Sequence, residues 1–145
     1  MGTWSLRRAE PEDAEALSAC LDAAYAVYAA RIADLPPVSA DCAGEIARHQ
    51  VWLAEIGTEV VGGLVLMPRD GFMLLANVAV HPSRKGAGLG RALLAHAEAE
   101  ALAQGYRELR LTTHADMPET HGFYARLGWQ ETGRSGKKVS MRKAI

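Results

Sequence analysis

Residues 74–94 read LLANVAVHPSRKGAGLGRALL and contain, in order, the patterns of a buried strand, a glycine-rich loop and a helix start. The run 72–80 is apolar and of strand length, with Asn77 as its only strongly polar member. Pro82 ends this run, because proline has no N–H to donate to a neighbouring strand. Leucines and alanines take up helical spacing from Leu89 onward. The glycines at 86, 88 and 90 are therefore predicted to lie at a helix N-terminus.

The glycine loop has the properties of an anion-binding site. Glycine lets the backbone turn tightly and approach a ligand without a Cβ in the way. The free N–H groups and the positive end of the helix dipole favour a negative ligand, and Arg84, Lys85 and Arg91 add positive charge. The loop alone is compatible with a phosphate cradle or with an ordinary strand–helix turn.

Two common phosphate-binding motifs do not fit this loop. A Walker loop needs Gly-Lys-Ser/Thr at its end, which is absent here. A dinucleotide fingerprint needs Gly-x-Gly-x-x-Gly after a first strand. In this chain Arg91 stands at the final glycine position and the loop lies in the middle of the sequence.

The loop resembles instead the signature of the GNAT superfamily, the Gcn5-related N-acetyltransferases, in its small bacterial form. That signature, Gln/Arg-x-x-Gly-x-Gly/Ala after a strand ending in Val-x-Pro, aligns with residues 85–90 and with Val80-His81-Pro82. Lys85 stands at the Gln/Arg position. Phe123-Tyr124-Ala-Arg-Leu-Gly-Trp129 is similar to the family's Tyr-x-x-x-Gly-Phe segment, with Trp where Phe is common.

The resemblance implies acetyl-CoA as a co-substrate. In the family this loop holds the pyrophosphate of coenzyme A. The strand before it diverges from the next strand and leaves main-chain groups free for the pantetheine arm. One bacterial branch often has Asn where this chain has Thr120. The cofactor-binding residues implied in this way are Val78, Ala79, Val80, Lys85, Gly86, Ala87, Gly88, Leu89, Gly90, Arg91 and Thr120.

Length and composition indicate one globular domain over residues 1–145. A net charge of -1 gives no electrostatic reason to expect nucleic acid or an anionic membrane as a partner. Cys20 and Cys42 show no disulfide or metal spacing and are expected to be reduced thiols in a cytoplasmic protein. The N-terminus has no signal-peptide pattern, no apolar run is long enough to span a bilayer, and no metal site is expected.

The remaining patterns predict a three-layer α+β domain. Helices are expected from Glu10-Pro-Glu-Asp13 through Ile32 to Pro36-Pro37, from Asp41 to about His49, and at 89–104 and 118–127. Strand patterns occur at 4–8, 51–56, 60–66, 72–80, 109–113, 129–132 and 139–142, with turns at 57–59, 67–71 and 133–136. With the resemblance, this order predicts a central mixed, mostly antiparallel sheet of about seven strands with four helices.

Tyr124 is the best candidate for the catalytic acid. A phenol with a pKa near ~10 stays protonated at neutral pH and can donate to a departing thiolate. The alternative is a tyrosine whose ring packs in the core and whose hydroxyl meets water. Glu119, His114 and His121 are the candidate general bases, each able to relay a proton through water.

Acceptor recognition is assigned to the first helices, where Tyr25, Tyr28 and Arg31 cluster. Arg31 could pair with a substrate carboxylate or be a solvated arginine at a helix end. The predicted function is transfer of an acetyl group from acetyl-CoA to a primary amine, of a small molecule rather than a protein, directly within a ternary complex. A non-catalytic acyl-CoA sensor, O-acetylation or a longer acyl chain are the alternatives, and a homodimer through the closing strands is plausible.

Overall fold

The computed structural model describes residues 4–29 and 41–145 of the chain. The described residues form one seven-stranded sheet in the order β1-β2-β3-β4-β5-β7-β6. The elements are β1 (Ser5–Arg8), the 3₁₀ turn η1 (Pro11–Asp13), α1 (Ala14–Ala29), α2 (Cys42–Arg48), β2 (Gln50–Ile56), β3 (Glu59–Pro68), β4 (Met73–Val80), η2 (Pro82–Arg84), α3 (Leu89–Ala103), β5 (Glu108–His114), α4 (Pro118–Arg126), β6 (Gln130–Ser135) and β7 (Lys138–Ala144).

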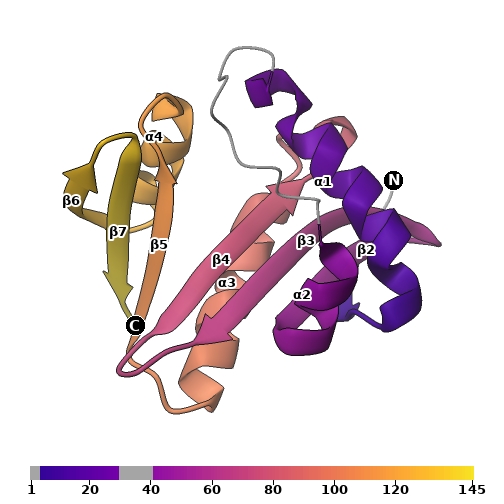
Figure 1. Ribbon diagram of the computed structural model, residues 1–145, viewed down its shortest axis with the longest axis horizontal. Helices are drawn as coiled ribbons and strands as arrows, with labels where there is room; N and C mark the ends of the chain where they lie inside the picture. The colour runs from indigo at the N-terminus through magenta and orange to yellow at the C-terminus, as the bar shows by residue number, and fades with distance from the viewer. Residues whose placement is uncertain (1–3, 30–40) are drawn as a thin grey trace.

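The sheet is mixed and mostly antiparallel, as predicted. Every pair of neighbouring strands is antiparallel except β4 and β5, which are parallel. Helices α1 and α2 lie on one face of the sheet and α3 lies on the other (Figure 1). The predicted three-layer α+β fold with four helices is confirmed.

Two turns lie at other residues than the sequence predicted. The turn expected at 133–136 lies at Gly136 and Lys137, and Gly133 is inside β6 beside a register shift. Every residue of β6 is exposed, so its sequence lacks the apolar alternation that marks a half-buried strand. Strand β3 continues through Pro68, so the turn expected at 67–71 begins only after this residue. Ile32 and Pro36-Pro37 lie outside the described residues.

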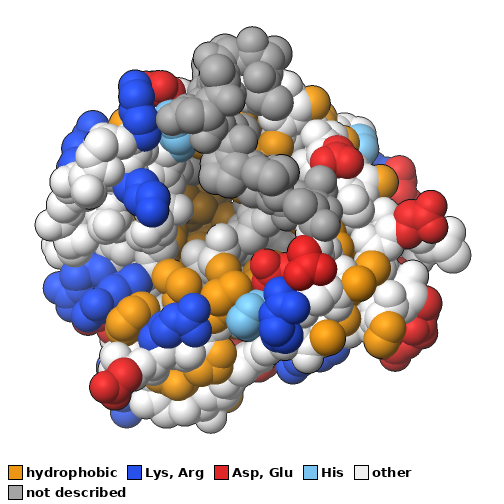
Figure 2. All heavy atoms as spheres, in the orientation of Figure 1, with side chains coloured by type: hydrophobic (Ala, Val, Ile, Leu, Met, Phe, Trp, Pro, Cys, Tyr) orange, Lys and Arg blue, Asp and Glu red, His pale blue; other side chains and the backbone are white. Residues whose placement is uncertain are grey.

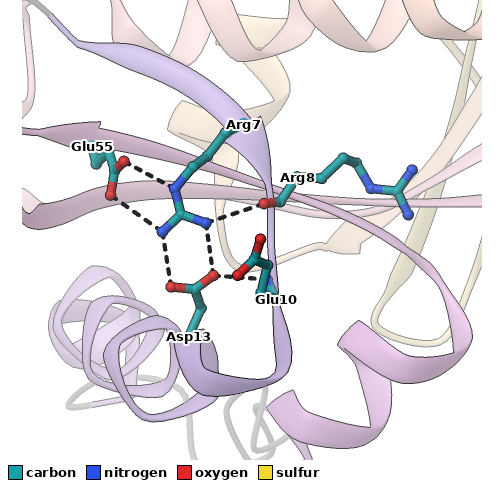
Figure 3. A network of polar contacts seen from close by, with 5 residues as sticks. All are labelled: Arg7, Arg8, Glu10, Asp13 and Glu55. Atoms are coloured by element: carbon teal, nitrogen blue, oxygen red, sulfur yellow. Dashed lines mark hydrogen bonds and ion pairs between the residues drawn. The ribbon is translucent and has the colours of Figure 1, made fainter.

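The start of α1 is anchored to the sheet by Arg7 (Figure 3). Its guanidinium donates two hydrogen bonds of 2.8 Å to the carboxylate of Asp13 and one of 2.9 Å to Glu55. The Asp13 carboxylate also accepts from the N–H of Glu10 at 2.7 Å, so it caps the helix start predicted there. The Arg7 contact holds the pKa of Asp13 below its usual value. This network fixes β1, β2 and the entry to α1 relative to one another.

The sheet is packed on both faces. Leu64, Leu66, Leu93 and Leu109 belong to the cluster on the α3 side. Leu17, Leu21, Val51, Leu53 and Val65 belong to the cluster under α1 and α2. Cys20 and Cys42 are both buried. In the described part of the chain, no helix is both long and apolar enough to cross a bilayer.

Candidate functional site

The parallel strands β4 and β5 separate along their length. They pair only at Met73 with Leu109 and at Leu74 with Arg110, and beyond these positions they diverge (Figure 1). On its other side β4 stays paired with β3, with a register shift that leaves Ala76 without an opposite residue. The β5-facing edge of β4 from Leu75 to Val80 therefore has backbone groups that no β5 residue pairs with. Buried backbone groups need such partners, so this edge can accept an extended ligand.

A cavity of about 660 Å³ occupies the gap between the two strands. Figure 2 shows this face of the molecule hollowed at its middle, with hydrophobic side chains in the hollow. The wall is formed by residues 75–80 of β4 and 111–113 of β5, together with parts of α1, the glycine loop and α4. The cavity therefore joins all the segments that the sequence pointed to.

The glycine loop lies at one end of this cavity. Gly86 and Gly88 have φ angles of 81° and 87°, which side chains with a Cβ rarely adopt. The first backbone hydrogen bond of α3 runs from Ala92 N–H to the Gly88 carbonyl, at 3.1 Å. The N–H groups of the first helical residues, 89–91, therefore have no carbonyl one turn earlier. At Gly90 a Cβ would lie 3.4 Å from the Phe123 ring, so the helix start and α4 are close neighbours.

Basic side chains line the same cavity as the glycine loop. Arg84, Lys85, Arg91 and Arg126 all contribute to its wall. The Arg84 guanidinium has a weak contact of 3.5 Å with Glu59, and the Lys85 ammonium lies 5.7 Å from the centre of the Tyr28 ring. Free N–H groups at a helix start, with four cations around them, can hold a phosphate or pyrophosphate group.

Most of the predicted cofactor-binding residues lie in this wall. Ala87 is the exception, and its N–H donates to the Arg84 carbonyl at 3.3 Å within the loop. The predicted residues that line the cavity are Val78, Ala79, Val80, Lys85, Gly86, Gly88, Leu89, Gly90, Arg91 and Thr120.

Tyr124 lies in the wall formed by α4. Its residue exposure is 6%, and its ring packs against those of Phe123 and Trp129, each at 5.6 Å between centroids. Burial raises the pKa of the phenol above its ordinary value, and the nearby Tyr25 and Tyr28 add to this effect. The phenol is therefore protonated throughout the neutral range and is a possible proton donor to a group in the cavity.

A hydrogen bond between Tyr25 and Asn77 crosses from α1 to β4. The Tyr25 hydroxyl donates to Asn77 Oδ1 at 3.0 Å, and both residues line the cavity. Burial raises the pKa of Tyr25 to about 12, so this hydroxyl keeps its proton. The sequence placed each residue near the site but did not predict their contact. No periodic pattern links two residues that are 52 positions apart.

The candidate bases are in different positions. Glu119 lines the cavity, whereas His114 and His121 are not among its wall residues. One ring nitrogen of His121 lies 2.9 Å from the His114 carbonyl, and His114 Nδ1 accepts from the N–H of Asp116 at 3.1 Å. Both histidines thus have local structural contacts. Within residues 4–29 and 41–145 no group of potential ligands could hold a metal ion.

The predicted acceptor residues are only partly covered by the structure. Tyr28 lines the cavity, and its ring is 6.2 Å from that of Tyr25. Arg31 lies outside the described residues. The sequence missed several wall residues, because isolated apolar side chains carry no motif; these include Leu75, Leu111 and Met117.

Comparisons with known proteins agree on one family. Residues 14–129 match the model of the acetyltransferase (GNAT) family. Mycothiol acetyltransferase from Nocardia farcinica is 35% identical over 126 residues, which cover 86% of this chain and 39% of that protein. Human N-acetyltransferase 8B is 31% identical over 90 residues, which cover 58% of this chain and 40% of that protein. The chain thus spans 40% or less of the length of either relative.

The fold is also found among solved structures. The PaiA N-acetyltransferase from Thermoplasma acidophilum, solved in complex with coenzyme A, superposes with a TM-score of 0.89. The superposition covers 99% of each chain at 20% sequence identity. At this level of identity the likeness concerns the fold alone.

Proposed function

We propose that this chain, which belongs to the acetyltransferase (GNAT) family, transfers an acetyl group from acetyl-CoA to a primary amine of a small molecule. Residues 1–145 act as a single catalytic domain in this proposal. One observation carries it. The glycine loop, the open edge of β4 and the buried Tyr124 line one continuous cavity, so groups suited to bind pyrophosphate, an extended arm and a leaving thiolate share one site.

The residues that line the large cavity fit coenzyme A. The N–H groups at the start of α3 and the surrounding cations would hold the pyrophosphate. The unpaired edge of β4 would hydrogen-bond to the pantetheine arm through its main chain, as it would to an additional β-strand. Thr120, in the first turn of α4, would contribute from the wall that α4 forms. Ala87 stays in the proposed loop as a spacer whose N–H bonds within the loop.

The reaction is a balanced exchange of one C–S bond for one C–N bond. The nitrogen lone pair of a neutral amine attacks the thioester carbonyl carbon, the C–N bond forms and the C–S bond breaks. Tyr124 donates its proton to the departing sulfur and regains one, through solvent, from the nitrogen. The products are the N-acetylated amine and free CoA. Glu119 is the candidate base with a place in the cavity wall, and His114 and His121 would have to act through water.

Direct transfer is favoured over an acyl-enzyme. Neither Cys20 nor Cys42 is among the residues that line the large cavity. Burial raises the pKa of Cys20 to about 11, so this thiol is a poor nucleophile at neutral pH. The acetyl group would therefore pass to the amine while both substrates are bound.

Calorimetry with CoA and acetyl-CoA tests the proposed cofactor site. Gly88→Asp brings a carboxylate to the loop and strains a backbone with a φ of 87°. We expect it to weaken CoA binding at least ~100-fold, because like charges placed together cost several kcal/mol. Gly57→Asp is the matched control: Gly57 also has a positive φ, 61°, and an open surrounding, but lies in the β2–β3 turn. It should bind CoA normally.

Mass spectrometry of amine mixtures incubated with acetyl-CoA then tests catalysis. Acetylated products that depend on the protein support the enzyme. Tight CoA binding with no product from small amines or peptides would favour the non-catalytic acyl-CoA sensor instead. Absence of CoA binding by the wild-type protein would contradict both.

A further inference from the structure

A second, smaller cavity adjoins the large one. It measures about 130 Å³ and lies between α1, α2 and the sheet. Ala76 and Asn77 line both cavities, so the two meet at the register shift of β4. Asn77 is also the residue that Tyr25 holds by a hydrogen bond. The small cavity therefore opens next to the site where the acetyl group is proposed to be transferred.

The small cavity is apolar except at Asn77 and Glu45. Leu17, Leu21, Cys42 and Val65 form its buried walls. Glu45 of α2 is the one ionisable carboxylate among its lining residues. The Glu45 side chain is 33% exposed, but its Oε2 atom is buried and has no hydrogen-bond partner in the described part of the chain. The His49 ring nitrogen lies 3.7 Å from this oxygen, beyond hydrogen-bond distance.

A carboxylate in this position favours a positively charged partner. A buried charged oxygen without a hydrogen bond is costly, and a donor from a ligand would remove that cost. Burial acts with the charge of Glu45 in raising the pKa of the Cys42 thiol, and Asp41 adds to this effect. Asp41 is neutralised by Arg48 at 2.9 Å. The small cavity is thus negative, whereas the glycine-loop end of the large cavity is positive.

We propose that the small cavity is an acceptor subsite for short amines that carry a second positive charge at their far end. This inference rests on the acetyltransferase function proposed above. The reacting amine lies beside Asn77, and the carbon chain points between Leu21 and Val65 toward Glu45. A volume of 130 Å³ is that of about four water-sized groups, so the tail is about three methylenes and an ammonium.

Three acceptors with the same four-carbon chain test this inference, because they differ in the group at the far end. They are 1,4-diaminobutane, butylamine and 4-aminobutanoate, with a positive, an apolar and a negative end. We expect kcat/KM for the diamine to exceed that for butylamine at least ~10-fold, well above the twofold gain from having two equivalent amines. A preference for 4-aminobutanoate would overturn the inference and favour the pairing of Arg31 with a carboxylate.

Glu45→Gln removes the charge at nearly constant volume. We expect kcat/KM for the diamine to fall about 10- to 100-fold, with little change for butylamine and none in CoA affinity. Glu98→Gln is the matched control, because Glu98 lies on α3, on the opposite face of the sheet. There its carboxylate pairs with Lys143 at 2.8 Å. It should keep the wild-type preference for the diamine.

The outcomes separate this inference from the function on which it rests. Equal use of the three acceptors, or a Glu45→Gln variant that keeps the diamine preference, would overturn the subsite while the enzyme stands. Normal CoA binding with no product from any of the three would also overturn the subsite. Loss of CoA binding in wild-type protein would contradict the proposed function itself.

Discussion

Tyr124 combines a packing role with the position of a proton donor. Its ring lies between those of Phe123 and Trp129, and its phenol belongs to the wall of the large cavity. Removing only the oxygen leaves this packing intact. We expect Tyr124→Phe to lower kcat by about 10²–10⁴-fold, the usual contribution of a general acid, and to leave CoA affinity unchanged. Steady-state kinetics together with calorimetry measures the two effects separately. Unchanged kcat would show that the phenol only packs.

The raised pKa of Tyr124 gives the same residue a pH signature. A group whose pKa is raised stays protonated to a higher pH than usual, and the ordinary value here is 10.0. The acid form is therefore present throughout the neutral and mildly alkaline range. Between about pH 7 and pH 10, we expect kcat to depend on pH in the same way in the wild type and in Tyr124→Phe. An alkaline limb centred below pH 9 in wild type alone would contradict this assignment.

At the scale of elements, two adjacent glycines in β3 bring both helical layers close to the sheet. A Cβ at Gly62 would lie 3.1 Å from the Ala79 carbonyl oxygen and 3.2–3.3 Å from Leu89 and Leu93 on the α3 side. A Cβ at Gly63 would lie 2.9 Å from Leu17 of α1. Successive residues of a strand point to opposite faces, so each glycine serves one layer. Close packing here sets the depth at which α1 and α3 border the large cavity.

Gly62→Val tests this packing. Two extra branches against a backbone oxygen and two buried leucines cannot be accommodated without movement of α3 or β4. We expect a loss of about 1–3 kcal/mol in the free energy of unfolding, measured by urea denaturation. Gly133→Ala is the control, because nothing lies within 4 Å of its added Cβ and β6 is exposed. Equal stability of the two variants would contradict the packing argument.

The same elements show what the sequence could predict. Helix and strand signals that act locally were sufficient for most boundaries. The capping residues before α1 and the glycines before α3 lie where the patterns indicated. Strand β6 was predicted too short, because an exposed edge strand needs no apolar alternation. Its register shift near Gly133 depends on β7 and has no local signal.

At the scale of the whole molecule, the site contains features that only the folded chain creates. The sequence predicted the glycine loop and Tyr124, since both belong to contiguous motifs. It did not predict the hydrogen bond from Tyr25 to Asn77 or the small cavity beside Glu45. That cavity is made by residues from four elements, α1, α2, β3 and β4. The homodimer through the closing strands stays a prediction.

Stability in alkali is also a property of the whole molecule. Cys20 is 2% exposed, and burial raises its pKa from 9.0 to about 11. The unfolded chain releases this proton near pH 9, whereas the folded chain keeps it to about pH 11. Unfolding therefore releases a proton in this interval, and the free energy of unfolding falls as pH rises. Tyr25, with a pKa raised to about 12, adds to the same trend above pH 10.

Cys20→Ala isolates this contribution. A shift of about two pKa units corresponds to about 2–3 kcal/mol in full, of which about 1 kcal/mol is lost by pH 10. We expect wild type to lose about 1 kcal/mol more than Cys20→Ala between pH 8 and pH 10, each compared with its own stability at pH 8. The smaller side chain lowers both values for the variant alike, so the difference in slope reports the thiol. Urea denaturation at pH 8, 9 and 10 measures it, and parallel curves for the two proteins would show that the buried thiol does not govern alkaline stability.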